Sequence, residues 1–126
     1  MKIAMVSLIV NDPLEAHRFY TETLGFTSRM LEPEARLAIV ASPNDPDGTG
    51  LLLEPNDHPV SQAFQQGVYQ LGMPVIVFGV EDVYQEAERL KSLGVVFRRE
   101  PAPAAYGGHD AIIEDGCGNL VQLYQA

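Results

Sequence analysis

Two stretches of this chain carry the same pattern of hydrophobic and polar positions, about 70 residues apart. Each begins with an alternating apolar run that is typical of a strand, over residues 3–10 and 74–80. Each continues as an amphipathic helix, for which Asp12 and Asp82 are the predicted N-caps and Gly25 and Gly94 the predicted ends. The apolar helical positions are Ala16, Phe19, Tyr20 and Leu24 in the first stretch, and Val83, Ala87, Leu90 and Leu93 in the second.

Three further strands are predicted after each helix, over residues 26–31, 36–41 and 50–54 and then over residues 95–99, 109–114 and 120–124. The order strand-helix-strand-strand-strand therefore occurs twice, which predicts one structural unit used twice. We expect a single domain spanning residues 1–126, with module one at about 1–56, a linker at about 57–72 and module two at about 73–126. The linker has a predicted short helix around residues 61–68.

Side chains at successive strand positions point to opposite faces of a sheet, so the pattern also predicts which face each helix covers. The residues expected against the helices are Ala4, Val6, Leu8, Val10, Leu51, Leu53, Val121 and Leu123. The opposite face carries the predicted ligand-binding residues, namely Met5, Ser7, Leu52, Glu54, Val75, Val77, Gln122 and Tyr124. Under the repeat, Met5 is expected to correspond to Val75, and Glu54 to Gln122.

Charge and cysteine content narrow the possible partners. The formal net charge of −9 repels phosphate backbones and anionic membrane surfaces, so we expect neither nucleic acid nor a membrane as a partner. The apolar run at residues 3–10 is shorter than the about 20 residues that a membrane helix needs, and no signal-peptide pattern follows it. One cysteine, Cys117, excludes an internal disulfide and agrees with a cytoplasmic location. We expect its thiol to be exposed in the Gly116–Gly118 turn.

The helix ends and the last strand resemble the vicinal oxygen chelate superfamily, which includes glyoxalase I, extradiol dioxygenases and bleomycin-resistance proteins. This resemblance covers nearly the whole chain and implies an α+β fold of paired βαβββ modules that form an open cup-shaped sheet, commonly in homodimers. The segments that carry it are Val10-Asn-Asp-Pro13, Phe19-Tyr20, Leu24-Gly25-Phe26, Val80-Glu-Asp-Val83, Leu93-Gly94-Val95 and Glu114-Asp-Gly-Cys-Gly-Asn-Leu-Val-Gln-Leu123.

Metal enzymes of this superfamily place His, Glu or Gln ligands at four positions, which the resemblance assigns here to Met5, Glu54, Val75 and Gln122. A thioether is a poor ligand for a hard cation, and valine offers no donor atom. The resemblance therefore implies a metal-independent protein without a cofactor, which binds a small organic molecule such as a drug or metabolite in the cup. Glu54 and Gln122 would be its polar contacts.

Two alternatives remain open at this point. One is a lyase, isomerase or dioxygenase-type enzyme acting through Glu54, with or without a divalent metal at Glu54 and Gln122; the other is a structural dimer without a ligand. In an apolar cup Glu54 could transfer a proton, whereas at a wet strand end it would be inert. His109 follows two glycines and titrates near neutral pH, so it is a second catalytic candidate, or else an exposed strand residue. His17 is expected to be exposed and His58 to lie in a turn.

Overall fold

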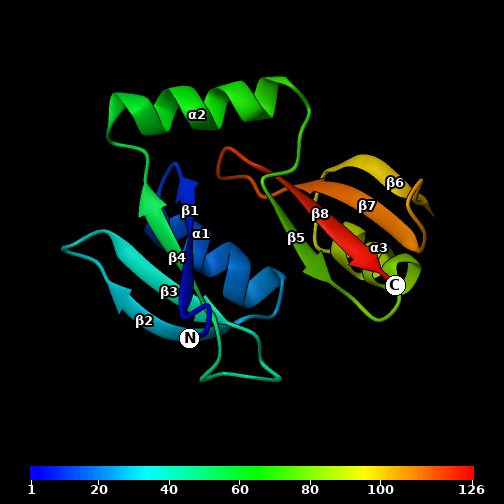
Figure 1. The fold of residues 1–126 in the computed structure, drawn as a ribbon, viewed down its shortest axis with the longest axis horizontal. Helices are drawn as coiled ribbons and strands as arrows, with labels where there is room; N and C mark the ends of the chain where they lie inside the picture. Colours follow the sequence, from blue (N-terminus) through cyan, green and yellow to red (C-terminus); the bar gives the residue numbers. More distant parts are fainter. The chain divides into compact units, whose positions relative to one another are not determined.

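Each of the two predicted segments forms an open four-stranded sheet with one helix on it (Figure 1). The computed structural model describes all residues 1–126, which divide into two compact units, Met1–Gln65 and Gln66–Ala126. The first unit contains β1 (Met5–Val10), α1 (Pro13–Arg18), η1 (Phe19–Thr23), β2 (Thr27–Glu32), β3 (Leu37–Ala41) and β4 (Gly50–Pro55). The second contains β5 (Ile76–Gly79), α3 (Val83–Ser92), β6 (Phe97–Pro103), β7 (His109–Glu114) and β8 (Leu120–Gln125). The boundary falls inside α2 (Pro59–Gln70).

The two sheets have the same topology. Their strand orders are β1-β4-β3-β2 and β5-β8-β7-β6, with the first pair parallel and the others antiparallel in both sheets. This equivalence confirms the prediction of an α+β fold made of two βαβββ modules. The predicted helix between the modules is also confirmed, since α2 contains the whole range 61–68.

The helix ends form where the capping residues predict them. Asp12 Oδ1 accepts a hydrogen bond from the Leu14 N–H (2.9 Å), and Asp82 Oδ1 accepts from the Tyr84 and Gln85 N–H groups (3.0 Å each). These bonds satisfy N–H groups that have no partner within the helix. Gly25 and Gly94 end the helices with φ of 89° and 85°, a conformation that a residue without Cβ adopts at little cost.

The last turn of the first helix is wider than an α-turn. In η1 the Leu24 N–H donates to Phe19 O, five residues back (3.0 Å). Tyr20 and Leu90, both fully buried, are 70 positions apart, but Gly25 and Gly94 are 69 apart. The first helix therefore holds one residue more after Tyr20, and the wide turn accommodates it. The sequence analysis predicts regular α-helical spacing through Leu24, and this prediction is wrong for the last turn.

Both cores lie between a helix and one face of its sheet. Leu8, Val10, Leu51 and Leu53 are buried with α1, and Val121 and Leu123 are buried with α3, as the alternation predicts. Ala4 and Val6 depart from the prediction, because both are exposed, Val6 by 41% of its surface. The reason is that α1 packs on β2, β3 and β4, which leaves the beginning of the edge strand β1 uncovered.

Cys117 is buried, so the prediction of an exposed thiol is wrong. The turn before β8 curls inward around the carboxylate of Asp115. Asp115 Oδ1 accepts from the Cys117 N–H (2.7 Å) and the Asn119 N–H (3.0 Å), and Oδ2 accepts from Asn119 Nδ2 (3.1 Å). Because these polar groups are paired in hydrogen bonds with one another, the turn can be buried, and the Cys117 thiol is buried within it.

The two ends of α2 make different contacts. In the first unit, the buried Gln65 donates to Ile9 O (3.2 Å) and accepts from Asn56 Nδ2 (2.8 Å). In the second unit, Tyr69 OH donates to Glu114 Oε1 (2.5 Å), and Arg98 Nη1 donates to the same oxygen (2.8 Å). No helix of the structure, α2 included, has the length and apolar character needed to cross a membrane.

The contact between Tyr69 and Glu114 predicts a dependence of stability on acid. Hydrogen bonds from Tyr69 and then Arg98 lower the pKa of Glu114 below 4.5, and the bond to Glu114 raises the pKa of Tyr69. A lowered carboxyl pKa adds stability that is present above about pH 4.5 and is lost as the pH falls through the folded-state value. We therefore expect Glu114→Gln to lower the free energy of unfolding at pH 7 and to lose this effect progressively as the pH falls below 4.5, measured by urea denaturation at pH 7 and over an acidic pH series. Glu15→Gln, in an exposed pair with Arg18, is the control and should show neither effect.

Candidate functional site

A buried carboxylate organises the face of the module-two sheet that α3 does not cover. Asp110 of β7 pairs with Tyr124 of β8, and Gln122 lies two positions along on the same face. Gln122 Nε2 donates to Asp110 Oδ2 (2.7 Å) and also to Tyr106 OH. Arg99 forms an ion pair with Asp110, with Nη2 2.9 Å from Oδ1, and its Nη1 donates a long hydrogen bond to Oδ2 (3.4 Å). Asp110 is only 1% exposed as a result.

These contacts determine how the Gln122 amide is oriented. An ionised carboxylate can only accept hydrogen bonds, so the NH₂ group of Gln122 must face Asp110. Both of its N–H groups are then used, one by Asp110 and one by Tyr106. The carbonyl oxygen Oε1 has no partner within the protein and remains available as an acceptor on this face.

Two tyrosine rings lie beside this amide. The centroids of Tyr106 and Tyr124 are 5.7 Å apart and the rings are tilted by 33°. Tyr106 is 67% exposed and is brought there by a loop with glycine at 107 and 108. A Cβ at Gly108, which has φ of 69°, would lie 2.3 Å from Gln125 O and 2.9 Å from the Tyr124 ring. Only glycine therefore permits this close approach of the loop to β8.

In module one, the predicted site residues lie on the face opposite α1. Leu52 and Glu54 are half-buried and alternate along β4 with the buried Leu51 and Leu53, and Met5 and Ser7 are exposed on β1. The Glu54 carboxylate has no hydrogen bond or ion pair within the chain, so it is free to contact a ligand. In module two, Val75 lies just before β5 and is half-buried, and Val77 lies within β5 and is exposed.

The strand register corrects one predicted correspondence. Ser7 pairs with Leu52, and Val77 pairs with Gln122, so Leu52 and Gln122 occupy equivalent positions 70 residues apart. Glu54 pairs with Ile9 and is equivalent to Tyr124. The expectation that Glu54 corresponds to Gln122 is therefore wrong. The parallel pairing of β4 with β1 and of β8 with β5 determines which residues of β4 and β8 correspond. The prediction instead matched the polar side chains of Glu54 and Gln122, and it was therefore two residues out of register.

The histidines lie away from this cluster. His109 Nδ1 is 3.0 Å from Tyr84 OH on α3, so His109 is on the opposite face of the module-two sheet from Gln122. His58 Nδ1 accepts from the Val60 N–H (3.1 Å) at the start of α2, which confirms its position in a turn. His17 is half-buried rather than exposed, because its Nε2 bonds to Ser28 Oγ (2.7 Å).

A sequence model described as the Glyoxalase/Bleomycin resistance protein/Dioxygenase superfamily matches residues 2–123. The chain belongs to this superfamily. A protein of Bacillus subtilis named YurT is 42% identical over 99% of both chains, and a probable lactoylglutathione lyase of Vibrio parahaemolyticus is 29% identical over 98% of this chain and 90% of its own. The crystal structure of TnmS3, an antibiotic-binding protein from Streptomyces sp. CB03234, superposes with a TM-score of 0.77 at 25% identity, covering 99% of this chain and 95% of that one. These matches confirm the resemblance in the sequence.

The donor atoms of this chain do not fit the metal site of the superfamily's metalloenzymes. If Gln122 is kept as the ligand position of module two, the register gives Leu52 as its counterpart, so the four positions hold Met5 and Leu52 in module one, and Val75 and Gln122 in module two. Gln122 is the one residue of the four with an oxygen donor, and a catalytic site needs three protein ligands. Elsewhere in the chain, no three His, Cys, Asp or Glu side chains gather closely enough to hold a metal ion.

Sequence reasoning missed the residues that hold Gln122 in place. Asp110, Arg99 and Tyr106 come from β7, β6 and the loop between them, and their meeting depends on how these strands pair. One signal was available. Asp110 has the same parity as Ile112, which pairs with Gln122, so alternation along β7 places a carboxylate on the Gln122 face.

Proposed function

We propose that this protein binds a small organic molecule, without a metal ion, on the sheet faces that the helices leave uncovered. The observation that carries the proposal is the orientation of Gln122, whose carbonyl is held outward by Asp110 and Tyr106 beside two tyrosine rings. A ligand hydroxyl or amide N–H can donate to that carbonyl, and an apolar or aromatic body can pack on the rings. Similarity to TnmS3, an antibiotic-binding protein, supports this class of ligand.

Two further properties belong to the proposal. Glu54 of module one offers a polar contact for a ligand on the uncovered face of its own sheet, since its carboxylate has no partner of its own. The protein also works as a homodimer in the cytoplasm. Support for the dimer comes from the exposed apolar side chains Ile3, Met5 and Val6 at the beginning of β1, because edge strands with apolar side chains favour association.

The alternative is a lyase or isomerase that uses Glu54 for proton transfer. The observation in its favour is the likeness to a Vibrio protein named probable lactoylglutathione lyase. A half-buried carboxylate without a partner can act as a base, which keeps this alternative open. A dioxygenase-type reaction at a metal has less support, because Met5, Leu52 and Val75 offer no ligand of the kind that such a metal needs.

We expect the purified protein to carry no stoichiometric transition metal and to show no glyoxalase I activity. A structural zinc site contributes about 10–16 kcal/mol shared among its ligands, so the loss of three of four donors removes most of the affinity. The measurements are elemental analysis after growth in metal-supplemented medium, a methylglyoxal–glutathione assay, and native mass spectrometry for a retained organic molecule. Gln122→Leu should release that molecule.

A variant that should gain metal binding serves as the positive control for this test. The triple variant Met5→His, Leu52→Glu, Val75→His should bind nickel or zinc where the parent does not. About one metal ion per chain in the parent, lost on Gln122→Leu or on Glu54→Ala, would overturn the proposal and favour the metalloenzyme.

A further inference from the structure

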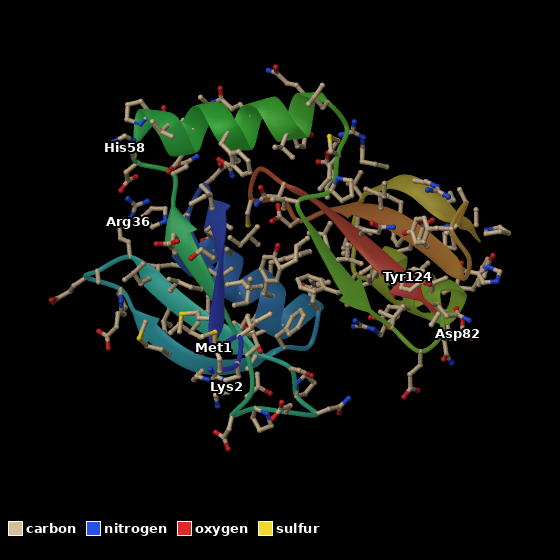
Figure 2. All side chains as sticks on the ribbon, viewed as in Figure 1. Met1, Lys2, Arg36, His58, Asp82 and Tyr124 are labelled. Atoms are coloured by element: carbon tan, nitrogen blue, oxygen red, sulfur yellow. The ribbon has the colours of Figure 1, made fainter.

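Module one contains an open cavity that lies outside the Gln122 cluster. Its volume is about 660 Å³, which lies within the range of about 300–1,000 Å³ typical of small-molecule sites. It lies between the residues that precede β1, the strand β2 and the β3–β4 loop. Figure 2 shows Lys2 beside the start of β1. The lining residues are Lys2, Ile3, Ala4, Met5, Arg29, Asp45, Asp47, Gly48 and Thr49.

The walls of this cavity are held by hydrogen bonds. Thr49 Oγ1 donates to Ile3 O (2.8 Å) and the Gly50 N–H donates to Ala4 O (3.0 Å), which ties the loop to the chain before β1. Within the loop, the Gly48 N–H donates to Asp45 O (3.0 Å). The Asp45 carboxylate lies over Gly48, where an added Cβ would be 2.1 Å from Oδ2. A ligand therefore meets a shape that is already formed, which lowers the entropy cost of binding.

Arg29 is placed in this cavity by an irregularity of β2. The pairing of β2 with β3 shifts register between Ser28 and Met30, and such a bulge redirects the side chain it carries. Arg29 Nη2 donates to Pro46 O (2.7 Å) and Gly48 O (2.6 Å), and Nε donates to Pro46 O (3.2 Å). Nη1 donates to no group of the protein and lies over Gly50, where a Cβ would be only 2.9 Å away. A guanidinium is thus fixed in place with one nitrogen unused.

The charges around the cavity are unpaired. Six ion pairs form in this protein, and none includes Lys2, Arg29, Asp45 or Asp47. The two cationic side chains come from the N-terminal segment and β2, and the two carboxylates come from the β3–β4 loop. A simple anion would be repelled by the carboxylates and by the net charge of −9, and a simple cation would be repelled by Arg29 and Lys2.

We propose that this cavity binds a small zwitterion of the amino-acid class. Its carboxylate contacts Arg29 Nη1 and Lys2, and its ammonium group contacts Asp45 and Asp47. An arginine fixed by carbonyl groups and lacking a carboxylate partner is well suited to a carboxylate, because charge-assisted hydrogen bonds are the stronger ones. The site shares no residue with the Gln122 cluster, so the two proposals can fail separately.

The test compares ε-aminocaproate with caproate and hexylammonium, each of which keeps one of its two charges. Titrations followed by ¹H–¹⁵N NMR should show ε-aminocaproate binding about tenfold more tightly than either comparator, with the largest shifts at the amides of residues 47–50. The variants Lys2→Gln and Asp45→Asn/Asp47→Asn should each weaken binding several-fold, and Arg29→Gln about tenfold. Arg36→Gln is the matched control, because Arg36 pairs with Asp57 away from the cavity, and it should bind like the parent.

Three results would overturn the proposal. These are caproate binding as tightly as the zwitterion, shifts confined to residues outside module one, and unchanged affinity in the lysine and aspartate variants. Arg29→Gln removes bonds that hold the loop and can disturb its structure. The Lys2 and Asp45/Asp47 variants remove no hydrogen bond that the loop uses, so they keep the test decisive.

Discussion

Replacement of Leu53 by alanine lowers the free energy of unfolding by about 2–5 kcal/mol. Leu53 is fully buried in β4, where it pairs with Leu8 of β1 and Ala38 of β3 in the layer under α1. The shortened side chain loses apolar burial and leaves a space that a four-stranded sheet cannot close. For a chain of 126 residues, we expect the melting temperature to fall by roughly 8–19 °C. Urea denaturation and calorimetry measure the two quantities.

Leu52→Ala is the matched control for this prediction. Leu52 is chemically identical and is the preceding residue of the same strand, but it lies on the face opposite α1 and is only half-buried. Its replacement should cost about 1 kcal/mol or less. A larger loss from Leu52→Ala than from Leu53→Ala would show that the strand is shifted by one residue, because such a slip exchanges the two faces.

Asp110→Ala disrupts the Gln122 cluster more than any other single change outside Gln122 itself. It removes one of the two acceptors of Gln122 Nε2 and the ionic partner of Arg99. We expect a loss of about 1–3 kcal/mol in the free energy of unfolding, since the half-buried amide of Gln122 loses one hydrogen bond and Arg99 loses its carboxylate partner. The Gln122 side-chain NH₂ resonances should move toward those of an exposed glutamine. A small molecule retained by the parent should also dissociate during purification.

Asp110→Asn separates the charge from the hydrogen bond. Its amide oxygen still accepts from Gln122, so the NH₂ resonances should move less than in the alanine variant. Preserved resonances and preserved ligand in Asp110→Ala would mean that Asp110 does not orient Gln122. The proposed role of this cluster would then be wrong.

Much of the fold could be predicted because its signals are local. Asp12 and Asp82 accept from N–H groups two or three residues away, and Gly25 and Gly94 end their helices by their own conformation. The wide turn at η1 has no such signal, since it shows only when the spacings of the two helices are compared residue by residue. The burial of Cys117 was missed for another reason. It depends on the side chain of Asp115 satisfying the turn, which makes a polar sequence suitable for the interior.

The candidate site was predictable in part. Gln122 and Tyr124 were placed on the correct face by alternation along one strand, which needs no knowledge of the neighbouring strands. The equivalence of Gln122 with Leu52, by contrast, depends on the register of β1 with β4 and of β5 with β8. No single residue of these strands indicates that register. For Asp110 the difficulty is similar, because its partners come from three separate segments.

The wide turn at η1 bears on how the two halves of this chain diverged. An additional residue in a regular helix rotates everything after it by about 100°, which would turn Phe26 and β2 away from the core. Here the turn absorbs that residue between Tyr20 and Gly25, and the pairing of β1 with β4 still matches that of β5 with β8 at an offset of 70. If the halves descend from one duplicated ancestor, an insertion at this point left the register of the sheet intact. The unequal lengths of the two helices would then record a change in one copy that the fold could tolerate.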